Sequence, residues 1–294
     1  MKKLLQIIKW LLIVFLVVII AAISYIRFGR VLDSQIYRAS YKDEVINTAF
    51  DYDEMYLYLS DSTKIHAALF QPHDSIEIKA TIFHHAGNGM SLNDSQKRFY
   101  GPLIQNGYQI FTYERRGYGK STGKADNSQT LKDDANEVFD QAVSLQEVKG
   151  SRIIVWGTSI GGIFATANAA ARNDQISGLI IESAFSSFPD VAKFYASEIN
   201  MEKFKFIIPL IVNNDFPTNQ KIKKIDKPIV IIHSTEDKKI PFEFSEDIYA
   251  NANKENTEFW RIEGKHVRGI IKYEQAYIEK FDGILSGSVN TSSP

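Results

Sequence analysis

A serine flanked by two glycines, in the motif Gly-Thr-Ser-Ile-Gly at residues 157–161, has the spacing of a nucleophile on a sharp turn. An apolar run of strand length, residues 152–156, precedes the motif, and a helix-like run, residues 160–172, follows it. Side chains at the two glycine positions would crowd a strand-to-helix turn, so the serine hydroxyl is left projecting from it. We therefore predict Ser159 as a nucleophile at the edge of a sheet.

A serine hydroxyl is a weak nucleophile at neutral pH, so it needs a general base and a third group that orients this base. Where such a motif occurs in a parallel sheet, the acid and then the histidine come later in the chain, on loops after later strands. Asp237 follows the apolar run 228–233, and His266 follows the run 257–262. We predict His266 as the base and Asp237 as the acid that orients it.

Other carboxylates and histidines in the chain provide alternatives. Glu236 is adjacent to the predicted acid and Glu182 ends an earlier apolar run, so both are alternative acids. His66 and His73 lie near an early hairpin, and His233 ends a buried run. A hydrogen-bonded structural histidine is the simpler interpretation at these three positions.

Attack on a carbonyl group also requires backbone N–H groups that stabilise the developing oxyanion. One of them comes from the residue after the nucleophile, here Ile160, and the other from the loop after an early strand, here the run 80–83. We predict the amide of Ala86 as the second donor, with the amide of Gly87 as the alternative.

Composition narrows the class of protein. The chain has 294 residues, of which 44% are hydrophobic and 23% charged, so it is long enough for one sizeable core. The formal net charge of -1 provides no excess of positive charge, and we expect no nucleic-acid partner. The absence of cysteine excludes a disulfide framework, a thiolate metal site and a cysteine nucleophile. The adjacent His84 and His85 lack accompanying carboxylates, so we predict no metal and no cofactor.

The amino-terminal segment is uncharged from Trp10 to Ile26, rich in Leu, Ile and Val, and flanked by lysines before and arginines after. About 17 apolar residues with flanking basic side chains suffice to cross a bilayer, whereas the apolar core of a signal peptide is usually about 7–15 residues long. We predict a transmembrane anchor at residues 1–30, with a signal peptide cleaved near residues 22–24 as the alternative. The lysines before the span favour a cytoplasmic amino terminus and place the following domain on the non-cytoplasmic side.

Strand-length apolar runs alternate with helical patterns through the rest of the chain. After a predicted hairpin at 55–59 and 64–70, the strand-like runs are 80–83, 109–113, 152–156, 176–181, 228–233 and 257–262, and the helix-like runs are 95–106, 131–146, 160–172 and 243–252. This alternation predicts an α/β fold, with a mostly parallel central sheet covered by helices on both faces. Functional residues of such sheets lie at the carboxyl ends of the strands.

The alternation lapses at residues 185–220, which are rich in aromatic side chains and which we predict to form a small helical cap. Phe185, Phe188 and Phe194 are candidate substrate-binding residues, and the alternative is that such rings pack the segment onto the core. The remaining predicted boundaries are a linker at 31–50, the α/β domain at 51–285 and a flexible tail at 286–294.

Taken together, the motifs resemble the α/β-hydrolase superfamily, and within it the serine-aminopeptidase-like and membrane-anchored hydrolase-domain branch, over about residues 49–285. The motifs are, in chain order, the loop at His84, the turn Arg-Gly-Tyr-Gly-Lys-Ser at 116–121, the turn at Ser159, the sequence Glu-Ser-Ala-Phe-Ser-Ser at 182–187, and the loops of Asp237 and His266. The chain departs from the family where His85 and Ser234 replace the usual Gly, and where Glu114 replaces the usual Asp.

The resemblance implies a serine hydrolase that forms an acyl-enzyme on Ser159, with His266 and Asp237 completing a catalytic triad. Members of this branch hydrolyse peptides, carboxylic esters, thioesters and lipids, so the resemblance gives a mechanism rather than a substrate. The aromatic cap and the predicted anchor favour a carboxylic ester or a lipid-like small-molecule acyl substrate. Peptidase or acyltransferase activity, and a non-catalytic binding protein on the same fold, are the alternatives.

Overall fold

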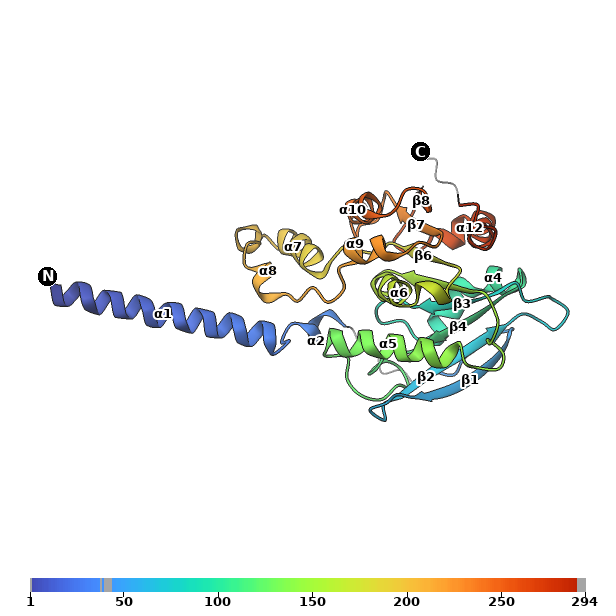
Figure 1. Cartoon of the computed structure of the whole chain (residues 1–294), viewed down its shortest axis with the longest axis horizontal. Helices are drawn as coiled ribbons and strands as arrows, with labels where there is room; N and C mark the ends of the chain where they lie inside the picture. The colour runs from blue at the N-terminus through green and yellow to red at the C-terminus, as the bar shows by residue number, and fades with distance from the viewer. Residues whose placement is uncertain (1, 38, 40–43, 290–294) are drawn as a thin grey trace.

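The computed structural model describes residues 2–37, 39 and 44–289, and it contains an eight-stranded sheet in the order β1-β2-β4-β3-β5-β6-β7-β8 (Figure 1). The strands are β1 (Asp51–Tyr58), β2 (Lys64–Gln71), β3 (Ala80–His85), β4 (Tyr108–Tyr113), β5 (Ile153–Thr158), β6 (Gly178–Glu182), β7 (Ile229–Ser234) and β8 (Thr257–Ile262). The first two strands form an antiparallel hairpin, β2 pairs antiparallel with β4, and the other six strands are parallel. This sheet confirms the predicted α/β-hydrolase fold.

Helices cover both faces of the sheet, as expected for strands such as β3, β5 and β7 in which every residue is buried. One face is covered by α5 (Ser128–Ala142), α6 (Ile160–Ala171), α9 (Thr218–Lys221) and α10 (Glu243–Asn251). The other face is covered by α4 (Gly101–Gln105), α11 (Gly269–Lys272) and α12 (Glu274–Ser286). Each face therefore has its own apolar core, and the two cores hold the sheet between them.

The segment between β3 and β4, where one helix is predicted at 95–106, is broken into three pieces. These are α3 (Leu92–Ser95), the π-helical turn η1 (Gln96–Tyr100) and α4. Pro102, which has no N–H to donate, lies in the first turn of α4, directly after the π-helical turn. A capping box at Ser91, which exchanges hydrogen bonds with Asp94, fixes the start of α3.

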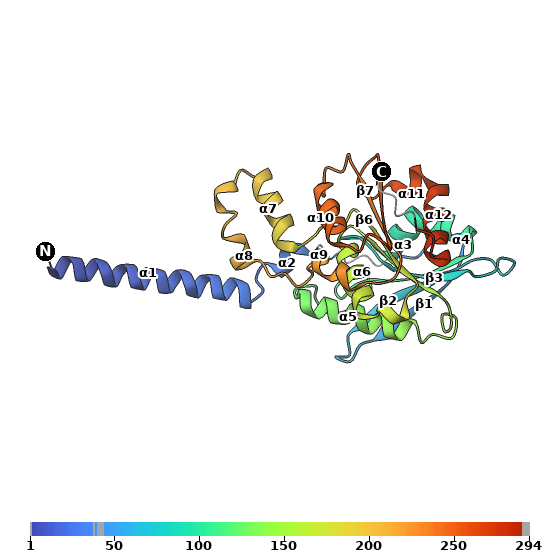
Figure 2. The same cartoon turned by 45° about the horizontal axis from the view of Figure 1, so that its top comes forward.

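A long connection between β6 and β7 contains α7 (Phe188–Glu198), η3 (Glu202–Phe204), α8 (Ile208–Ile211), α9 and η4 (Ile222–Lys224). The part of this connection that carries α7 and α8 extends away from the sheet in both views (Figures 1 and 2). It corresponds to most of the segment 185–220 that the sequence predicts to be a cap.

The amino-terminal helix α1 (Lys2–Phe28) projects from the domain as a single long rod (Figure 1). Its mean hydropathy over an 18-residue window is 2.9 and none of that window is buried, so by length and composition it is a candidate membrane anchor or signal sequence. The short helix α2 (Asp33–Ile36) connects it to the domain. At the other end of the chain, the predicted tail 286–294 begins in the last turn of α12, and residues 290–294 lie outside the described residues.

Candidate active site

Strand β5 turns directly into α6 at Ser159, whose backbone angles are φ 55° and ψ -126°. Such a positive φ is unfavourable for a residue other than glycine, and strain of this kind is concentrated at functional sites. The flanking glycines allow this turn, because a side chain at either position would clash with neighbouring atoms. A Cβ atom on Gly161 would collide with the carbonyl oxygens of His85 and Ala86, and one on Gly157 would lie 2.6 Å from the Cβ of Ala165.

The structure brings three of the predicted side chains together at the carboxyl edge of the sheet. His266 Nε2 lies 3.0 Å from Ser159 Oγ, and His266 Nδ1 lies 2.6 Å from Asp237 Oδ2. An ionised carboxylate only accepts hydrogen bonds, so Nδ1 carries the ring proton and Nε2 is left to accept the serine proton. This chain of contacts gives the hydroxyl a base and gives the base a fixed orientation.

The carboxyl group of Asp237 is fully buried and is held from several sides. Its Oδ1 accepts hydrogen bonds from the amides of Lys239 at 2.9 Å and Ile240 at 3.1 Å. Burial alone would raise the pKa of Asp237, but the neighbouring rings of His233 and His266 and the amide of Ile240 lower it well below its usual range. The carboxyl group is therefore negatively charged at neutral pH and can only accept a hydrogen bond from the His266 ring.

The alternative acids contact backbone amides instead of the imidazole. Glu236 Oε2 accepts from Gly264 N at 2.9 Å, and Glu182 Oε1 accepts from Gly269 N at 3.2 Å. Both contacts support the loop that carries His266. Burial raises the pKa of Glu182 to about 7.

The remaining histidines lie in structural hydrogen bonds or on the surface. His233 is fully buried, with Nδ1 2.5 Å from Ser245 Oγ and Nε2 2.9 Å from the carbonyl oxygen of Ile240. His73 is exposed on the loop after β2 and contacts Ser75.

The adjacent His84 and His85 point to opposite faces of β3, as successive strand residues do. Nδ1 of His84 lies 2.6 Å from Tyr100 Oη, and Nδ1 of His85 lies 3.1 Å from Tyr113 Oη. Burial lowers the pKa of His84 to about 3 and that of His85 well below its ordinary value, so both rings are neutral. Two rings on opposite faces cannot bind one ion together. Within the described part of the chain, no group of three or more His, Cys, Asp or Glu side chains has the spacing of a metal site.

The loop after β3 lies against the start of α6, next to the serine turn. In the part of the chain that the structure describes, the amides of Ala86 and Ile160 have no hydrogen-bond acceptor. Both belong to backbone adjacent to Ser159, and Ile160 is the first residue of α6, where helix N–H groups lack internal partners. These two N–H groups are thus available to an oxygen atom of a ligand.

Arg115, which the sequence analysis does not single out, holds this loop in place. It is 5% exposed, and its Nη1 and Nη2 donate to the carbonyl oxygens of Ala86 at 2.7 Å and Gly87 at 2.8 Å. Its guanidinium group also lies over the rings of Tyr118 and Phe164, with 4.8 Å and 5.3 Å to the ring centroids. A charged side chain buried this deeply requires such partners. The sequence shows only that Arg115 follows a strand. It does not show which groups Arg115 binds, because both acceptors are distant along the chain.

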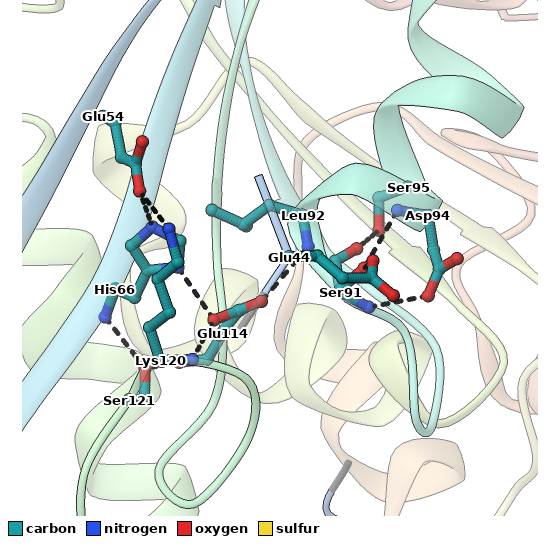
Figure 3. Close-up of polar contacts among 10 residues, drawn as sticks. All are labelled: Glu44, Glu54, His66, Ser91, Leu92, Asp94, Ser95, Glu114, Lys120 and Ser121. Atoms are coloured by element: carbon teal, nitrogen blue, oxygen red, sulfur yellow. Dashed lines mark hydrogen bonds and ion pairs between the residues drawn. The ribbon is translucent and has the colours of Figure 1, made fainter. Parts of the chain in front are cut away.

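The neighbouring Glu114 is the centre of a second polar cluster, shown in Figure 3. Its Oε2 accepts from Lys120 N at 2.7 Å and lies 2.8 Å from His66 Nδ1, while its Oε1 accepts from Leu92 N at 3.4 Å. His66 Nε2 in turn lies 2.7 Å from Glu54 Oε1. The cluster connects the hairpin, the turn at 114–121 and the start of α3, which follows the loop that carries Ala86.

The three aromatic residues predicted to bind substrate lie in or beside α7. Phe185 and Phe188 are 4% and 2% exposed, with ring centroids 5.3 Å apart, and Phe188 also packs against Phe216 at 5.9 Å. Phe194 packs against Phe244 at 6.4 Å. For Phe185 and Phe188 this burial favours the alternative of packing onto the core, and a substrate-binding role stays a prediction.

Comparison with known proteins finds similarity to α/β hydrolases. Residues 76–216 match the family model described as serine aminopeptidase, S33. The chain is 24% identical over 221 residues to the α/β hydrolase domain-containing protein WAV2 of Arabidopsis thaliana, covering 72% of this chain and 70% of the relative. It is 26% identical over 213 residues to human α/β hydrolase domain-containing protein 17B, covering 71% of this chain and 67% of the relative.

Solved structures of similar fold include esterases. The esterase Pf2001 of Pyrococcus furiosus superposes with a TM-score of 0.62 at 20% identity, covering 85% of this chain and 97% of the esterase. Est1E of Butyrivibrio proteoclasticus, solved with ferulic acid bound, superposes with a TM-score of 0.61 at 21% identity, covering 79% of this chain and 99% of that one. At sequence identities this low, the superpositions show a common fold and no more than that.

Proposed function

We propose that this chain is a serine hydrolase of the α/β-hydrolase superfamily that uses Ser159, His266 and Asp237 as a catalytic triad. The observation that carries the proposal is the line of contacts from Ser159 Oγ to His266 Nε2, at 3.0 Å, and from His266 Nδ1 to Asp237 Oδ2, at 2.6 Å. Both separations are within hydrogen-bonding reach, which is the geometric requirement for a base-activated nucleophile.

The reaction proceeds through two acyl-transfer steps. His266 Nε2 accepts the proton of Ser159 as Oγ bonds to the substrate carbonyl carbon, and the amides of Ala86 and Ile160 stabilise the oxyanion. The leaving group then departs with the proton from Nε2 and leaves an acyl-enzyme. His266 next accepts a proton from water as the water oxygen bonds to the acyl carbon, and it passes this proton to Ser159 Oγ as the bond between Oγ and the acyl carbon breaks and the acid is released.

We propose a carboxylic ester, or a related acyl bond in a lipid-like molecule, as the substrate. The similarity to esterases supports an ester, and the apolar character of the segment 185–220 supports an apolar acyl group. The match to the serine aminopeptidase model keeps peptidase activity as the second candidate.

We further propose that α1 anchors the enzyme in a membrane. Arg27 Nη1 donates to the carbonyl oxygen of Pro209 at 2.9 Å, and the guanidinium group of Arg30 forms an ion pair with Asp215 at 2.7 Å. A helix whose end is bound to the folded domain in this way favours a retained anchor over a cleaved signal. Lys2, Lys3 and Lys9, which precede the uncharged run 10–26 within α1, support a cytoplasmic amino terminus and a domain on the other side.

A serine-directed fluorophosphonate probe tests the triad directly. The wild-type chain should label, while Ser159→Ala and His266→Ala should label at rates lower by several powers of ten. Ser144→Ala and His73→Ala, which change an exposed serine and an exposed histidine away from the site, are the matched controls. Equal labelling of all five proteins would remove the proposal.

The acyl group is tested with p-nitrophenyl esters of increasing chain length beside aminoacyl amides, assayed with the same enzyme preparation. We expect faster turnover of esters than of amides and a rise in kcat/KM with chain length. A preference for the amides would favour the peptidase candidate instead.

A further inference from the structure

The tip of the segment that carries α7 and α8 exposes large apolar side chains. They are Ile199 at 64% exposure, Met201 at 44%, Phe204 at 52%, Phe206 at 73% and Leu210 at 49%. Soluble domains rarely leave contiguous apolar surface of this kind in water, and such surface marks a site of contact with a partner or a membrane. We name these five residues the apolar tip.

The apolar tip lies beside the end of α1. Helix α8 contacts α1, and among the described residues of α1 only those in its last two turns are partly covered. Asn213 Nδ2 donates to the carbonyl oxygen of Arg27 at 2.9 Å, and Arg30 pairs with Asp215. Both views show the segment alongside the domain end of α1, separated from the sheet (Figures 1 and 2).

The length of α1 decides what surrounds this tip. A helix of 27 residues is about 40 Å long at 1.5 Å per residue, which exceeds the hydrocarbon thickness of about 30 Å. The uncharged run 10–26 ends at Arg27, so if α1 crosses a bilayer its last turn lies at the boundary between acyl chains and headgroups. A tip fixed against that turn lies at the same boundary.

We propose that the apolar tip inserts into the leaflet from which α1 emerges, so that the enzyme contacts the bilayer at two places. The segment has no excess of positive charge, because Glu198 and Glu202 offset Lys203 and Lys205. Attraction to anionic lipid is therefore not the main force, and insertion depends on apolar contact. The same contact should form on zwitterionic lipid.

The contact orients the active site toward the lipid. Tyr195 of α7 donates its hydroxyl to the carbonyl oxygen of Lys239 at 3.0 Å, two residues beyond Asp237. Asn88, in the loop after β3, donates to the carbonyl oxygen of Ile36, in the segment that follows α1. The carboxyl edge of the sheet thus faces the membrane. Resting on the proposed function, this orientation gives an acyl group held in the leaflet a short path to Ser159.

The absence of cysteine from the chain allows a direct test with single-cysteine variants of the full-length protein. An environment-sensitive fluorophore is attached to Phe206→Cys in the tip, to Val17→Cys in the middle of α1, and to Ile78→Cys. Ile78 is 45% exposed in the loop between β2 and β3, which extends on the side opposite α1 (Figure 1). Each variant is placed in nanodiscs of dioleoylphosphatidylcholine, with quenching measured by nitroxide lipids and by aqueous iodide.

We expect lipid quenching at positions 17 and 206, with position 206 about 5–10 Å below the headgroup boundary, and iodide quenching at position 78. If position 17 is quenched by lipid while position 206 behaves like position 78, the anchor stands and the insertion is refuted, and the tip is left as a surface for a protein. If position 17 is not quenched by lipid, the anchor and the insertion both fail. Fluorophosphonate labelling of Ser159 in each variant reports folding and tests the hydrolase independently of these outcomes.

Discussion

Substitution of Arg115 by methionine tests whether a buried arginine holds the oxyanion loop in position. Arg115→Met keeps an unbranched side chain of similar length but removes the hydrogen bonds to the carbonyl oxygens of Ala86 and Gly87, at 2.7 Å and 2.8 Å. Each is a bond from a charged donor, worth about 1.5–3 kcal/mol, so the loop loses up to about 3–6 kcal/mol of restraint.

The loss should appear in turnover more than in binding. The loop carries the amide of Ala86, and loss of one oxyanion donor lowers kcat by about 10²–10³. Other contacts of the loop remain, such as the hydrogen bond from Tyr118 Oη to Asn88 Oδ1 at 2.7 Å. We therefore expect kcat to fall about 100-fold with little change in KM, measured on a soluble p-nitrophenyl ester.

Arg172→Met is the matched control. Arg172 forms a two-bond ion pair with Asp140 at 2.7 Å and 2.6 Å, but Asp140 is half exposed and the pair lies away from the site. An exposed ion pair contributes about 0–1 kcal/mol, so this variant should keep wild-type kcat. Wild-type kcat and wild-type fluorophosphonate labelling in Arg115→Met would refute the role of Arg115 and leave it as a residue that only fills space.

Two further predictions concern carboxyl groups at the site. Asp237→Asn should lower kcat about 10⁴-fold without unfolding the protein, because the amide no longer selects the His266 tautomer with its proton on Nδ1, and near-normal ester turnover would contradict this. Glu182→Gln should remove a loss of stability that the wild type suffers as pH rises. Because burial raises the pKa of Glu182 in the folded state to about 7 from its ordinary value of 4.5, stability is fully present below pH 4.5 and is lost as pH rises through 7, by about 3 kcal/mol. Urea unfolding at pH 5 and pH 8 measures the difference between wild type and variant, and identical pH dependence in both would contradict it.

The parallel strands were predictable from the sequence because their burial leaves a simple signal. In β5 and β7 every residue is buried, and both appear in the sequence as short, nearly continuous apolar runs. The turn at Ser159 was predictable for a different reason, since its glycines are required by backbone sterics within a few residues. Signals of this kind depend only on neighbours along the chain.

Helix α12 was not predicted, although its pattern is present in the sequence. Its buried residues Tyr277, Ile278, Phe281 and Ile284 recur at helical spacing and pack against the core. The role of Arg115 had no comparable signal. Its acceptors, the carbonyl oxygens of Ala86 and Gly87, come near it only after β3 and β4 pair. Long-range contacts between a side chain and backbone are set by topology, which residue spacing does not record.

The apolar tip also differs from both interpretations that the sequence offered for its aromatic residues. Phe204 and Phe206 neither pack onto the core nor lie in an enclosed site, because both are more than half exposed. An apolar side chain in water costs free energy in proportion to its exposed area, so exposure of several such side chains is best explained by a partner outside the chain. With α1 anchored as proposed, the bilayer is the partner that lies next to this tip.

The segment after α1 is packed onto the domain and limits how the domain can turn relative to α1. Asp33 and Tyr37 are 3% and 5% exposed, although they lie within the stretch 31–50 predicted to be a linker. Asp33 Oδ2 accepts from Ser128 N at 2.8 Å, and the Tyr37 ring packs against Phe164 and Phe188. Since α1 ends at Phe28, few residues separate it from this buried attachment. A connection this short and this well packed restricts rotation of the domain about α1, so an α1 that anchors the chain as proposed would hold the apolar tip on the side of the bilayer.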